Sequence, residues 1–417
     1  MASLKLLWLD FVKDILLINV SGRDKPGVTS IITGVMSRFD VTVLDIGQAV
    51  IHDQLNLGIL AVLPKCDDSE AMIDNIQSNL LALDMQVQFS PISDERYQNW
   101  VEQQGKSRYI VTLLARKINA EHLAAVTTVT SDFGLNIDKI VRLSGRIKLD
   151  ETEKLGRACV EFSVRGDPEN ALQLKNALLE LSSKYDIDVA YQEDSIFRRN
   201  RRLVVFDMDS TLIDAEVIDE LAIEAGVGDQ VAAITEAAMQ GEIDFKQSFT
   251  QRMALLKGLD VSVLQSVAER LSLNEGAEHL ISTLKKLGYK TAIVSGGFTF
   301  FGEYLQQRLG VDYVYANQLD VKDGLVTGQV SGDIIDGQRK AELLREIAEK
   351  EGLKLQQVIA VGDGANDLPM LGIAGLGIAF RAKPLVKASA EQSISTLGLD
   401  GILYLLGYSD KDTLILD

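Results

Sequence analysis

The sequence predicts an α/β protein made of two small α+β units followed by a larger parallel α/β domain with a helical insertion. Two observations support this prediction. The order β-α-β-β-α-β is predicted twice, beginning at residue 14 and again at residue 109, which indicates two copies of one supersecondary unit. From Leu203 onward, short apolar runs alternate with helical stretches, as in a buried parallel sheet.

The two N-terminal units are predicted to be ferredoxin-like domains over residues 1–92 and 108–193, joined by a polar linker at 93–108. Alternating apolar residues favour strands, and apolar residues three or four positions apart favour helices. The elements expected in the first unit are 14–20, 28–39, 41–52, 55–63, 69–83 and 85–89. Those expected in the second are 109–115, 120–132, 135–143, 158–165, 168–183 and 187–191.

The third domain is expected over residues 200–417, with a helical cap at about 216–287. Insertions near the carboxyl edge of a parallel sheet often form lids. Its short buried strands are expected at 203–206, 291–294, 313–316, 358–361 and 377–379, with a hairpin over 315–330 that turns at Asp323-Gly324. The arginine-rich run before it, 194–202, could be a contact patch for acidic groups, but it is interpreted as a solvated boundary.

Net charge, the length of apolar stretches and the number of cysteines limit which partners and which cellular compartment fit this chain. Lys plus Arg is 42 and Asp plus Glu is 60, so the net charge of −18 disfavours binding to a nucleic-acid backbone. The longest mostly apolar stretch, 368–380, is shorter than the roughly 20 residues that span a bilayer, so no membrane partner is expected. Two cysteines, Cys66 and Cys159, fit a reducing cytoplasm, and no signal peptide is predicted.

Four groups of polar residues follow predicted strands or open a predicted helix. They are DMDST at 207–211, SGG at 295–297, Lys340, and GDGANDLPML at 362–371. Ligands of open α/β sheets bind beyond the carboxyl ends of strands, where three of these groups lie. A lysine in a first helical turn opposes the helix dipole, so Lys340 calls for an anionic neighbour.

Each group taken alone allows two interpretations. Asp207 and Asp209 could hold a cation or supply a nucleophile, or they could belong to a turn and a helix cap. The hydroxyl of Ser295 and the N–H groups near it suit phosphate oxygens, or they form a plain strand-to-helix turn. The order of all four groups along the chain is far more specific than any one of them.

This ordered set resembles the haloacid dehalogenase superfamily of phosphatases. Further matches over residues 200–417 are similar to the phosphoserine phosphatases: Glu216 nine residues after Asp207, Phe245 and Arg252 in FKQSFTQRMALLKGL, and NEGAEHL before the SGG group. The two N-terminal units resemble ACT domains, which are small amino-acid-sensing modules. The resemblance therefore implies a haloacid-dehalogenase-like (Rossmann-like) domain preceded by two ACT domains.

The resemblance also implies roles for the carboxylates. Asp207 would be the nucleophile, and Asp209 would donate and accept the protons. A Mg²⁺ ion would be held by the side chains of Asp207 and Asp363 and the backbone carbonyl of Asp209, with Asp367 behind these ligands. Mg²⁺ prefers oxygen ligands, and together with Lys340 it would offset the repulsion between clustered carboxylates and a dianionic phosphate.

The phosphoryl oxygens are expected to contact Ser295, Gly296 and Lys340, with Asn366 nearby. In the cap, Glu216 would pair with the substrate ammonium and Arg252 with its carboxylate.

Phe245 and Met239 would form an apolar wall that excludes water. Core packing for these two residues, and a surface position for Arg252, remain the alternatives.

The first ACT-like unit carries Asp24-Lys25-Pro26-Gly27, which matches the D-x-P-G turn of serine-type ACT domains. Asp24 and Gly27 are therefore expected to bind a regulatory amino acid, with L-serine the expected ligand; a purely structural turn is the alternative. The second unit has Arg116-Lys117-Ile118-Asn119 at the equivalent turn and lacks the motif, so its role could be limited to pairing sheets. Exposed sheet edges favour a homodimer.

The resemblance thus implies a Mg²⁺-dependent hydrolase of L-phosphoserine that works through an aspartyl-phosphate, completes serine biosynthesis and is regulated by amino-acid binding. Two alternatives stay open: a phosphatase or phosphotransferase for another small phosphorylated metabolite, and an amino-acid sensor with vestigial catalysis.

Overall fold

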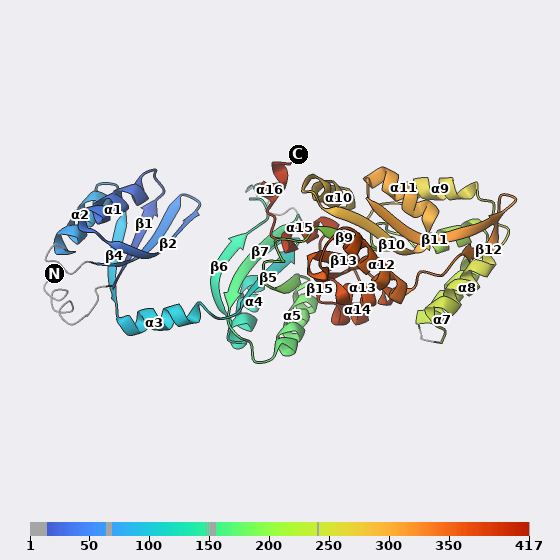
Figure 1. Ribbon diagram of the computed structural model, residues 1–417, viewed down its shortest axis with the longest axis horizontal. Helices are drawn as coiled ribbons and strands as arrows, with labels where there is room; N and C mark the ends of the chain where they lie inside the picture. The colour runs from blue at the N-terminus through green and yellow to red at the C-terminus, as the bar shows by residue number, and fades with distance from the viewer. Residues whose placement is uncertain are drawn as a thin grey trace. The chain divides into compact units, whose positions relative to one another are not determined.

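The computed structural model describes residues 15–63, 69–146, 148, 150, 156–239 and 242–416. The chain divides into two compact units, Met1–Lys106 and Ser107–Asp417. Figure 1 labels their helices and strands. The expectation that the N-terminus carries no signal peptide, and the one for Cys66, concern residues outside the described ranges.

The first unit contains one antiparallel sheet of strand order β2-β3-β1-β4, covered on one face by two helices (Figure 1). Leu16, Ile18 and Val20 alternate along β1 and enter the core under the helices, as the period of two predicts. The elements are β1 (Ile15–Arg23), α1 (Val28–Met36), β2 (Thr42–Ile51), β3 (Gln54–Val62), α2 (Ser69–Leu81) and β4 (Gln86–Ile92).

The edge strand β2 is exposed along its length, including the side chains of Val43, Ile46 and Val50. Beyond β4, part of the expected polar linker forms helix α3 (Asp94–Gln103). Its N-cap, Ser93, accepts a hydrogen bond from the N–H of Arg96, and two acidic residues in the first turn favour the helix dipole.

The second unit begins with a module of the same element order, whose sheet has the order β6-β7-β5-β8. Both faces of this sheet are buried. Val111 and Leu113 pack toward the helices, whereas Leu114 joins the core of the following domain together with Cys159 and Ala190. The elements are β5 (Arg108–Ala115), α4 (Ala120–Asp132), β6 (Asn136–Arg142), β7 (Ala158–Arg165), α5 (Ala171–Tyr185) and β8 (Asp188–Glu193).

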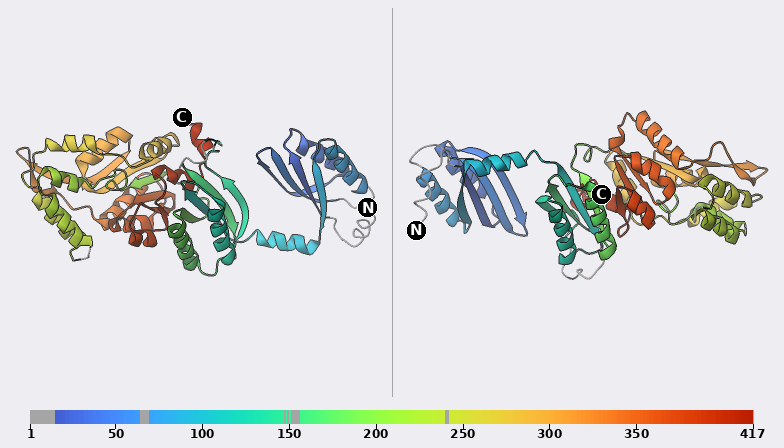
Figure 2. Two further views of the ribbon diagram at one scale, coloured as in Figure 1. Left: turned by 180° about the vertical axis from the view of Figure 1, so that it is seen from behind. Right: turned by 90° about the horizontal axis from the view of Figure 1, so that it is seen from below.

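The third domain is built on a seven-stranded sheet of order β12-β11-β10-β9-β13-β14-β15, parallel except for β12. Along β9, Val204 and Phe206 join one hydrophobic cluster, and Leu203 and Val205 join another. Helices accordingly cover both faces (Figures 1 and 2). The strands are β9 (Leu203–Phe206), β10 (Lys290–Phe298), β11 (Tyr313–Lys322), β12 (Leu325–Ser331), β13 (Val358–Gly362), β14 (Leu376–Phe380) and β15 (Gln392–Ile394).

The helical insertion follows β9, and the predicted hairpin is present as β11 and β12 with Asp323 and Gly324 at positive φ. The helices are α6 (Val217–Glu224), α7 (Gly228–Met239), α8 (Phe245–Leu255), α9 (Val263–Arg270), α10 (Ala277–Lys286), α11 (Thr299–Leu309), α12 (Gly337–Lys350), α13 (Leu368–Ile373), α14 (Pro384–Ser389), α15 (Ile402–Leu405) and α16 (Asp410–Leu414). Within the described ranges, no helix combines the length and apolar character that crossing a bilayer requires.

The arginine-rich run is not the solvated boundary that its charge suggests. Arg198 is only 2% exposed and pairs with Glu161 at 2.5 Å. Arg201 is also buried and donates to the Gln192 side chain and the Gly375 carbonyl. The prediction was wrong for these two residues because the fold brings Glu161 to Arg198 and Gly375 to Arg201 from 37 and 174 positions away.

Candidate active site

The predicted polar groups meet at the carboxyl edge of the central strands. Asp207 directly follows β9, and its N–H donates to the carbonyl of Val361 on β13 at 2.9 Å. The SGG group lies within the end of β10, and Asp363 follows β13. Since β10 and β13 both pair in parallel with β9, the fold gathers these residues at one edge.

Lys340 is the buried cation of this edge. Its fully buried Nζ lies 2.7 Å from Oδ2 of Asp207 and 2.7 Å from Oδ1 of Asp367. Burial alone would lower the pKa of Lys340, but these two carboxylates more than offset it and raise the pKa above the usual value. The anionic neighbour expected for Lys340 is therefore present twice.

Three carboxylates surround a common point: oxygens of Asp207, Asp363 and Asp367 all lie within 4.8 Å of one another. Burial and then the charge of Asp207 raise the pKa of Asp363 to about 8 and that of Asp367 to about 7. Thr211 donates to Asp363 at 3.1 Å and supports it.

The cluster fits a divalent cation. One lysine cannot neutralise three neighbouring carboxylates. Burial first, and then repulsion from Asp207, raises the pKa of Asp363 and of Asp367. Closely spaced carboxylate oxygens are the donors that hard divalent ions prefer. A divalent metal therefore suits this set of residues.

Asp209 lies against the second polar group. A Cβ atom added to Gly297 would come within 2.8 Å of Oδ2 of Asp209 and 2.6 Å of Cε of Met208, so a larger residue would force these side chains to shift. Burial, followed by the charges of Glu216 and Asp207, raises the pKa of Asp209 well above its usual value.

Ser295 is fully buried, and its hydroxyl accepts the N–H of Gly297 at 2.9 Å. Sequence reasoning missed the residue that holds this turn, Asn317. Its amide donates to the Gly296 carbonyl at 2.8 Å and accepts the N–H of Ile335 at 2.9 Å. Asn317 is not in any of the four motifs; its position on the neighbouring strand β11 is what brings it there.

The insertion places an aromatic ring beside the SGG turn, residues 295–297. Phe245 begins α8, which Asp244 and Gln247 start with a reciprocal capping box. The Cζ atom of Phe245 would lie 3.2 Å from a Cβ on Gly296, so the ring borders the turn. Met239 ends α7, but its side chain is outside the described part of the chain.

Arg252 and Glu216 are two charged residues near the carboxylates. Nε of Arg252 is buried and finds no hydrogen-bond partner among the described residues. Burial lowers the pKa of Arg252, opposed by Asp219, Glu216 and Asp209. Glu216 accepts a hydrogen bond from Ser210 at 2.8 Å, and its partial enclosure raises its pKa.

Asn366 lies in the short turn between Gly364 and Asp367, where its side-chain oxygen blocks space for a Cβ on Gly364. Asp24 and Gly27 belong to the first unit and form no part of this cluster.

Family models match the three parts of the chain. A haloacid dehalogenase-like hydrolase model matches residues 204–372, and two ACT domain models match residues 14–90 and 107–192. A phosphoserine phosphatase of Streptomyces coelicolor is 40% identical and aligns over 95% of this chain and 93% of its own length. The chain belongs to the phosphoserine phosphatase family.

Further relatives agree with this membership. Phosphoserine phosphatase SerB2 of Mycobacterium tuberculosis is 40% identical over 94% of this chain and 92% of its own. The structure of a probable phosphoserine phosphatase from Vibrio cholerae is 35% identical, with a TM-score of 0.57 over 74% of this chain and 88% of that one. The chain is thus a phosphoserine phosphatase with a haloacid dehalogenase-like domain and two ACT domains, as the sequence predicted.

Proposed function

We propose that this phosphatase hydrolyses L-phosphoserine to L-serine and phosphate through a phosphoryl group carried by Asp207, with Mg²⁺ bound at the carboxylate cluster. In this role it would catalyse the last step of serine biosynthesis. The observation that carries the proposal is the buried Lys340, which lies 2.7 Å from Asp207 and orients one of its oxygens. The other oxygen accepts the N–H of Met208 at 2.7 Å.

The cation would be held by the side chains of Asp207 and Asp363 and by the backbone carbonyl of Asp209. Asp367 is occupied by Lys340 and by the N–H of Gly364, so it would orient these groups from behind. When bound, Mg²⁺ offsets the charge of the phosphate and helps to hold its oxygens. Ser295, Gly296 and Lys340 would hold the remaining phosphoryl oxygens, with Asn366 nearby.

In the first half-reaction, an Asp207 oxygen attacks phosphorus as the bond between phosphorus and the serine oxygen breaks. Asp209 gives its proton to the departing serine oxygen, and its raised pKa favours the protonated form that this step needs. In the second, Asp209 takes a proton from water, whose oxygen attacks phosphorus. The bond to Asp207 breaks, and phosphate leaves.

The insertion would recognise the amino-acid part of the substrate. The buried Nε of Arg252 has no hydrogen-bond partner within the described ranges, which suits a bidentate pair with the substrate carboxylate. Glu216 would pair with the ammonium group. Phe245 borders Gly296 and would exclude water from the phosphoryl group. Met239, at the end of the preceding helix, is proposed to extend this apolar wall.

Regulation is proposed at the first ACT domain. A cavity of about 430 Å³ is lined by the DKPG turn, the start of α1, Gln48 and Leu55. Gly27 has φ 97° and caps α1, so the first N–H groups of the helix face this region and suit a carboxylate. We propose L-serine as the ligand, with Asp24 binding its ammonium. The exposed edge strand β2 supports a homodimer, and the free, buried Cys159 fits a cytoplasmic location.

Asp207→Asn is expected to abolish phosphoserine hydrolysis without unfolding the protein, because the amide keeps the shape but lacks the nucleophilic charge. Steady-state phosphate release and the thermal midpoint would measure both effects. Asp214→Asn, at an exposed position in the same region, serves as the control and should keep its activity. Activity of Asp207→Asn within tenfold of the parent would rule out the nucleophile assignment.

Mg²⁺ added to the chelator-treated protein is expected to raise the thermal midpoint and to restore hydrolysis. A ligand that binds only the native state at about a hundredfold excess over its Kd stabilises by about 2.7 kcal/mol. Asp363→Asn should lose most of the thermal shift, because it removes one proposed ligand. If Mg²⁺ raised the thermal midpoint equally in the parent and in the variant, the ion would bind at a site that does not include Asp363.

Arg252→Ala is expected to raise KM for phosphoserine by about tenfold to a hundredfold, the range of a charge-assisted hydrogen bond of about 1.5–3 kcal/mol. The KM for a phosphate ester without a carboxylate should change much less. Arg270→Ala is the matched control, since Arg270 pairs with Glu220 and Glu224 on the insertion surface. Equal losses on both substrates would contradict carboxylate recognition by Arg252.

Asp24→Ala is expected to weaken the response of the enzyme to free L-serine while leaving kcat without serine nearly unchanged. The reason is that the turn is proposed to contact the regulatory ligand and lies in the unit that lacks the catalytic cluster. Serine dose–response curves would test this, with Asp74→Ala on α2 of the same module as control. An unaltered curve in folded Asp24→Ala would assign any serine effect to product inhibition.

A further inference from the structure

The loop that follows the catalytic aspartates is held by one side chain from another part of the chain. Ser210, directly after Asp209, has φ 56°, a left-handed conformation that is uncommon for a residue other than glycine. The side-chain Nδ2 of the buried Asn274 lies within hydrogen-bond distance of three carbonyls of this loop, at 3.3 Å from Ser210, 2.9 Å from Thr211 and 3.1 Å from Ile213.

The environment of Asn274 defines the orientation of its amide. An amide nitrogen has two N–H donors, so the three carbonyls share them. Only the nitrogen can face three acceptors, and the opposite atom, Oδ1, lies 3.4 Å from a guanidinium nitrogen of Arg381. The backbone N–H of Asn274 adds a hydrogen bond to the Leu212 carbonyl at 2.9 Å. Both the main chain and the side chain of Asn274 thus support the loop.

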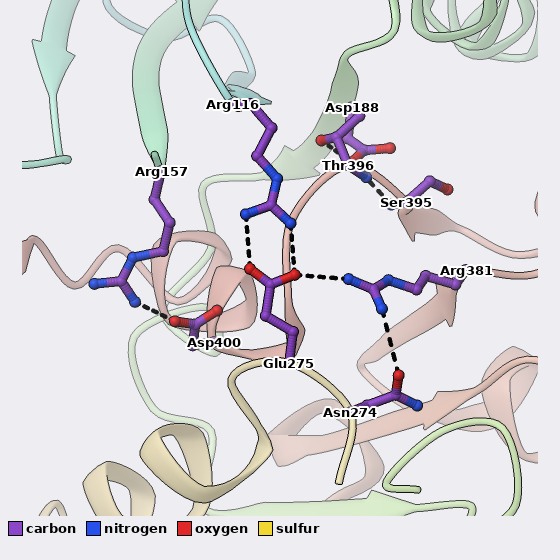
Figure 3. A network of polar contacts seen from close by, with 9 residues as sticks. All are labelled: Arg116, Arg157, Asp188, Asn274, Glu275, Arg381, Ser395, Thr396 and Asp400. Carbon is purple, nitrogen blue, oxygen red and sulfur yellow. Dashed lines mark hydrogen bonds and ion pairs between the residues drawn. The ribbon is translucent and has the colours of Figure 1, made fainter. Parts of the chain in front are cut away.

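The next residue, Glu275, links Asn274 to the second ACT domain. Its carboxylate accepts two hydrogen bonds from Arg116, at 2.7 and 2.5 Å, and one from Arg381 at 2.8 Å (Figure 3). Its backbone carbonyl accepts the N–H of Leu399 at 2.7 Å. Arg381 therefore contacts both Asn274 and Glu275, and Arg116 reaches the pair from the neighbouring domain (Figure 3).

Arg116 directly follows strand β5 in the second ACT domain. It opens the turn between β5 and α4, as Asp24 opens the turn between β1 and α1 in the first ACT domain. In the first domain this turn lines a cavity. In the second, Arg116 binds a carboxylate of the catalytic domain instead. The turn that lacks the D-x-P-G motif is thus used for a contact within the chain.

We propose that Asn274 is a positioning residue of the phosphatase, and that Arg116 of the second ACT domain, through Glu275 and Arg381, keeps Asn274 in place beneath the catalytic loop. The inference rests on the proposed roles of Asp207 and Asp209. Asn274 contacts the backbone of the loop that begins right after Asp209, so its effect is on the placement of the reacting groups.

The rest of the domain interface allows this contact to be tested separately. Leu114, Cys159 and Ala190 of the second ACT domain share a hydrophobic cluster with the catalytic domain, and Arg157 pairs with Asp400. Asp188 accepts three further hydrogen bonds from Ser395 and Thr396 (Figure 3). We therefore expect the two domains to stay docked when the Arg116 side chain is removed.

Asn274→Ala and Asn274→Asp in the full chain distinguish positioning from space filling. We expect Asn274→Ala to lower kcat for phosphoserine on the order of tenfold to a hundredfold, since a misplacement of about 1 Å can cost a hundredfold. KM should change much less, because Arg252 and Phe245 lie on another element. Asn274→Asp keeps the shape but turns a carboxylate oxygen toward three carbonyls, so its kcat should fall at least as far.

Arg116→Ala tests the contribution of the second ACT domain. We expect kcat to fall by roughly threefold to tenfold with KM little changed, and Arg116→Lys, which keeps the charge, should recover part of the loss. The control is Lys175→Ala, which removes a contact of the same domain interface, to the Ala390 carbonyl at 2.6 Å, away from Asn274. Combining Arg116→Ala with Asn274→Ala should lower kcat by less than the product of the two separate effects, because both act through one contact.

Each outcome has a definite meaning once thermal midpoints confirm folding. Parent-like kcat in Asn274→Ala or Asn274→Asp would overturn the positioning role. A kcat loss in Lys175→Ala equal to that in Arg116→Ala, or fully multiplicative effects in the double variant, would overturn the link through Arg116. An active Asp207→Asn variant would instead refute the proposed catalytic assignment, so the two failures are distinguishable.

Discussion

The carboxylate cluster depends on the contacts that the buried ammonium of Lys340 makes with Asp207 and Asp367. A fully buried cation is tolerable only beside anions, and Asp207 and Asp367 both lie 2.7 Å from its Nζ. The same contacts restrain Asp207, which the backbone N–H of Met208 also binds. A cluster of three carboxylates, two of which contact this one ammonium, still carries uncompensated negative charge, and this excess suits a divalent cation.

Close backbone approach is the second constraint on the site. Gly297 leaves room for Asp209 and Met208, and Gly296 leaves room for the ring of Phe245 from the insertion. The turn is then fixed by Asn317, which bonds both the Gly296 carbonyl and the N–H of Ile335. The shape of this turn thus depends on its two glycines as much as on the groups around them.

The two ACT domains share an element order but use their sheets differently. In the first domain, helices cover one face and the edge strand β2 is exposed. In the second, the opposite face of the sheet joins the core of the catalytic domain through Leu114, Cys159 and Ala190. Buried polar contacts reinforce this junction, including Arg198 with Glu161. Shared apolar burial explains why the second domain and the catalytic domain form one compact unit.

The sequence by itself determined the repeat, the parallel α/β domain and the catalytic motifs, because period-two and helical patterns and short motifs are local. It also indicated that Lys340 needs an anionic neighbour. Only the tertiary structure decided which residues from distant segments lie next to one another. Asn317 contacts the SGG turn, Asn274 contacts the loop after Asp209, and Arg198 and Arg201 are buried rather than solvated. Their partners lie between 9 and 174 positions away in the chain, and no local pattern reports a contact that long-range packing creates.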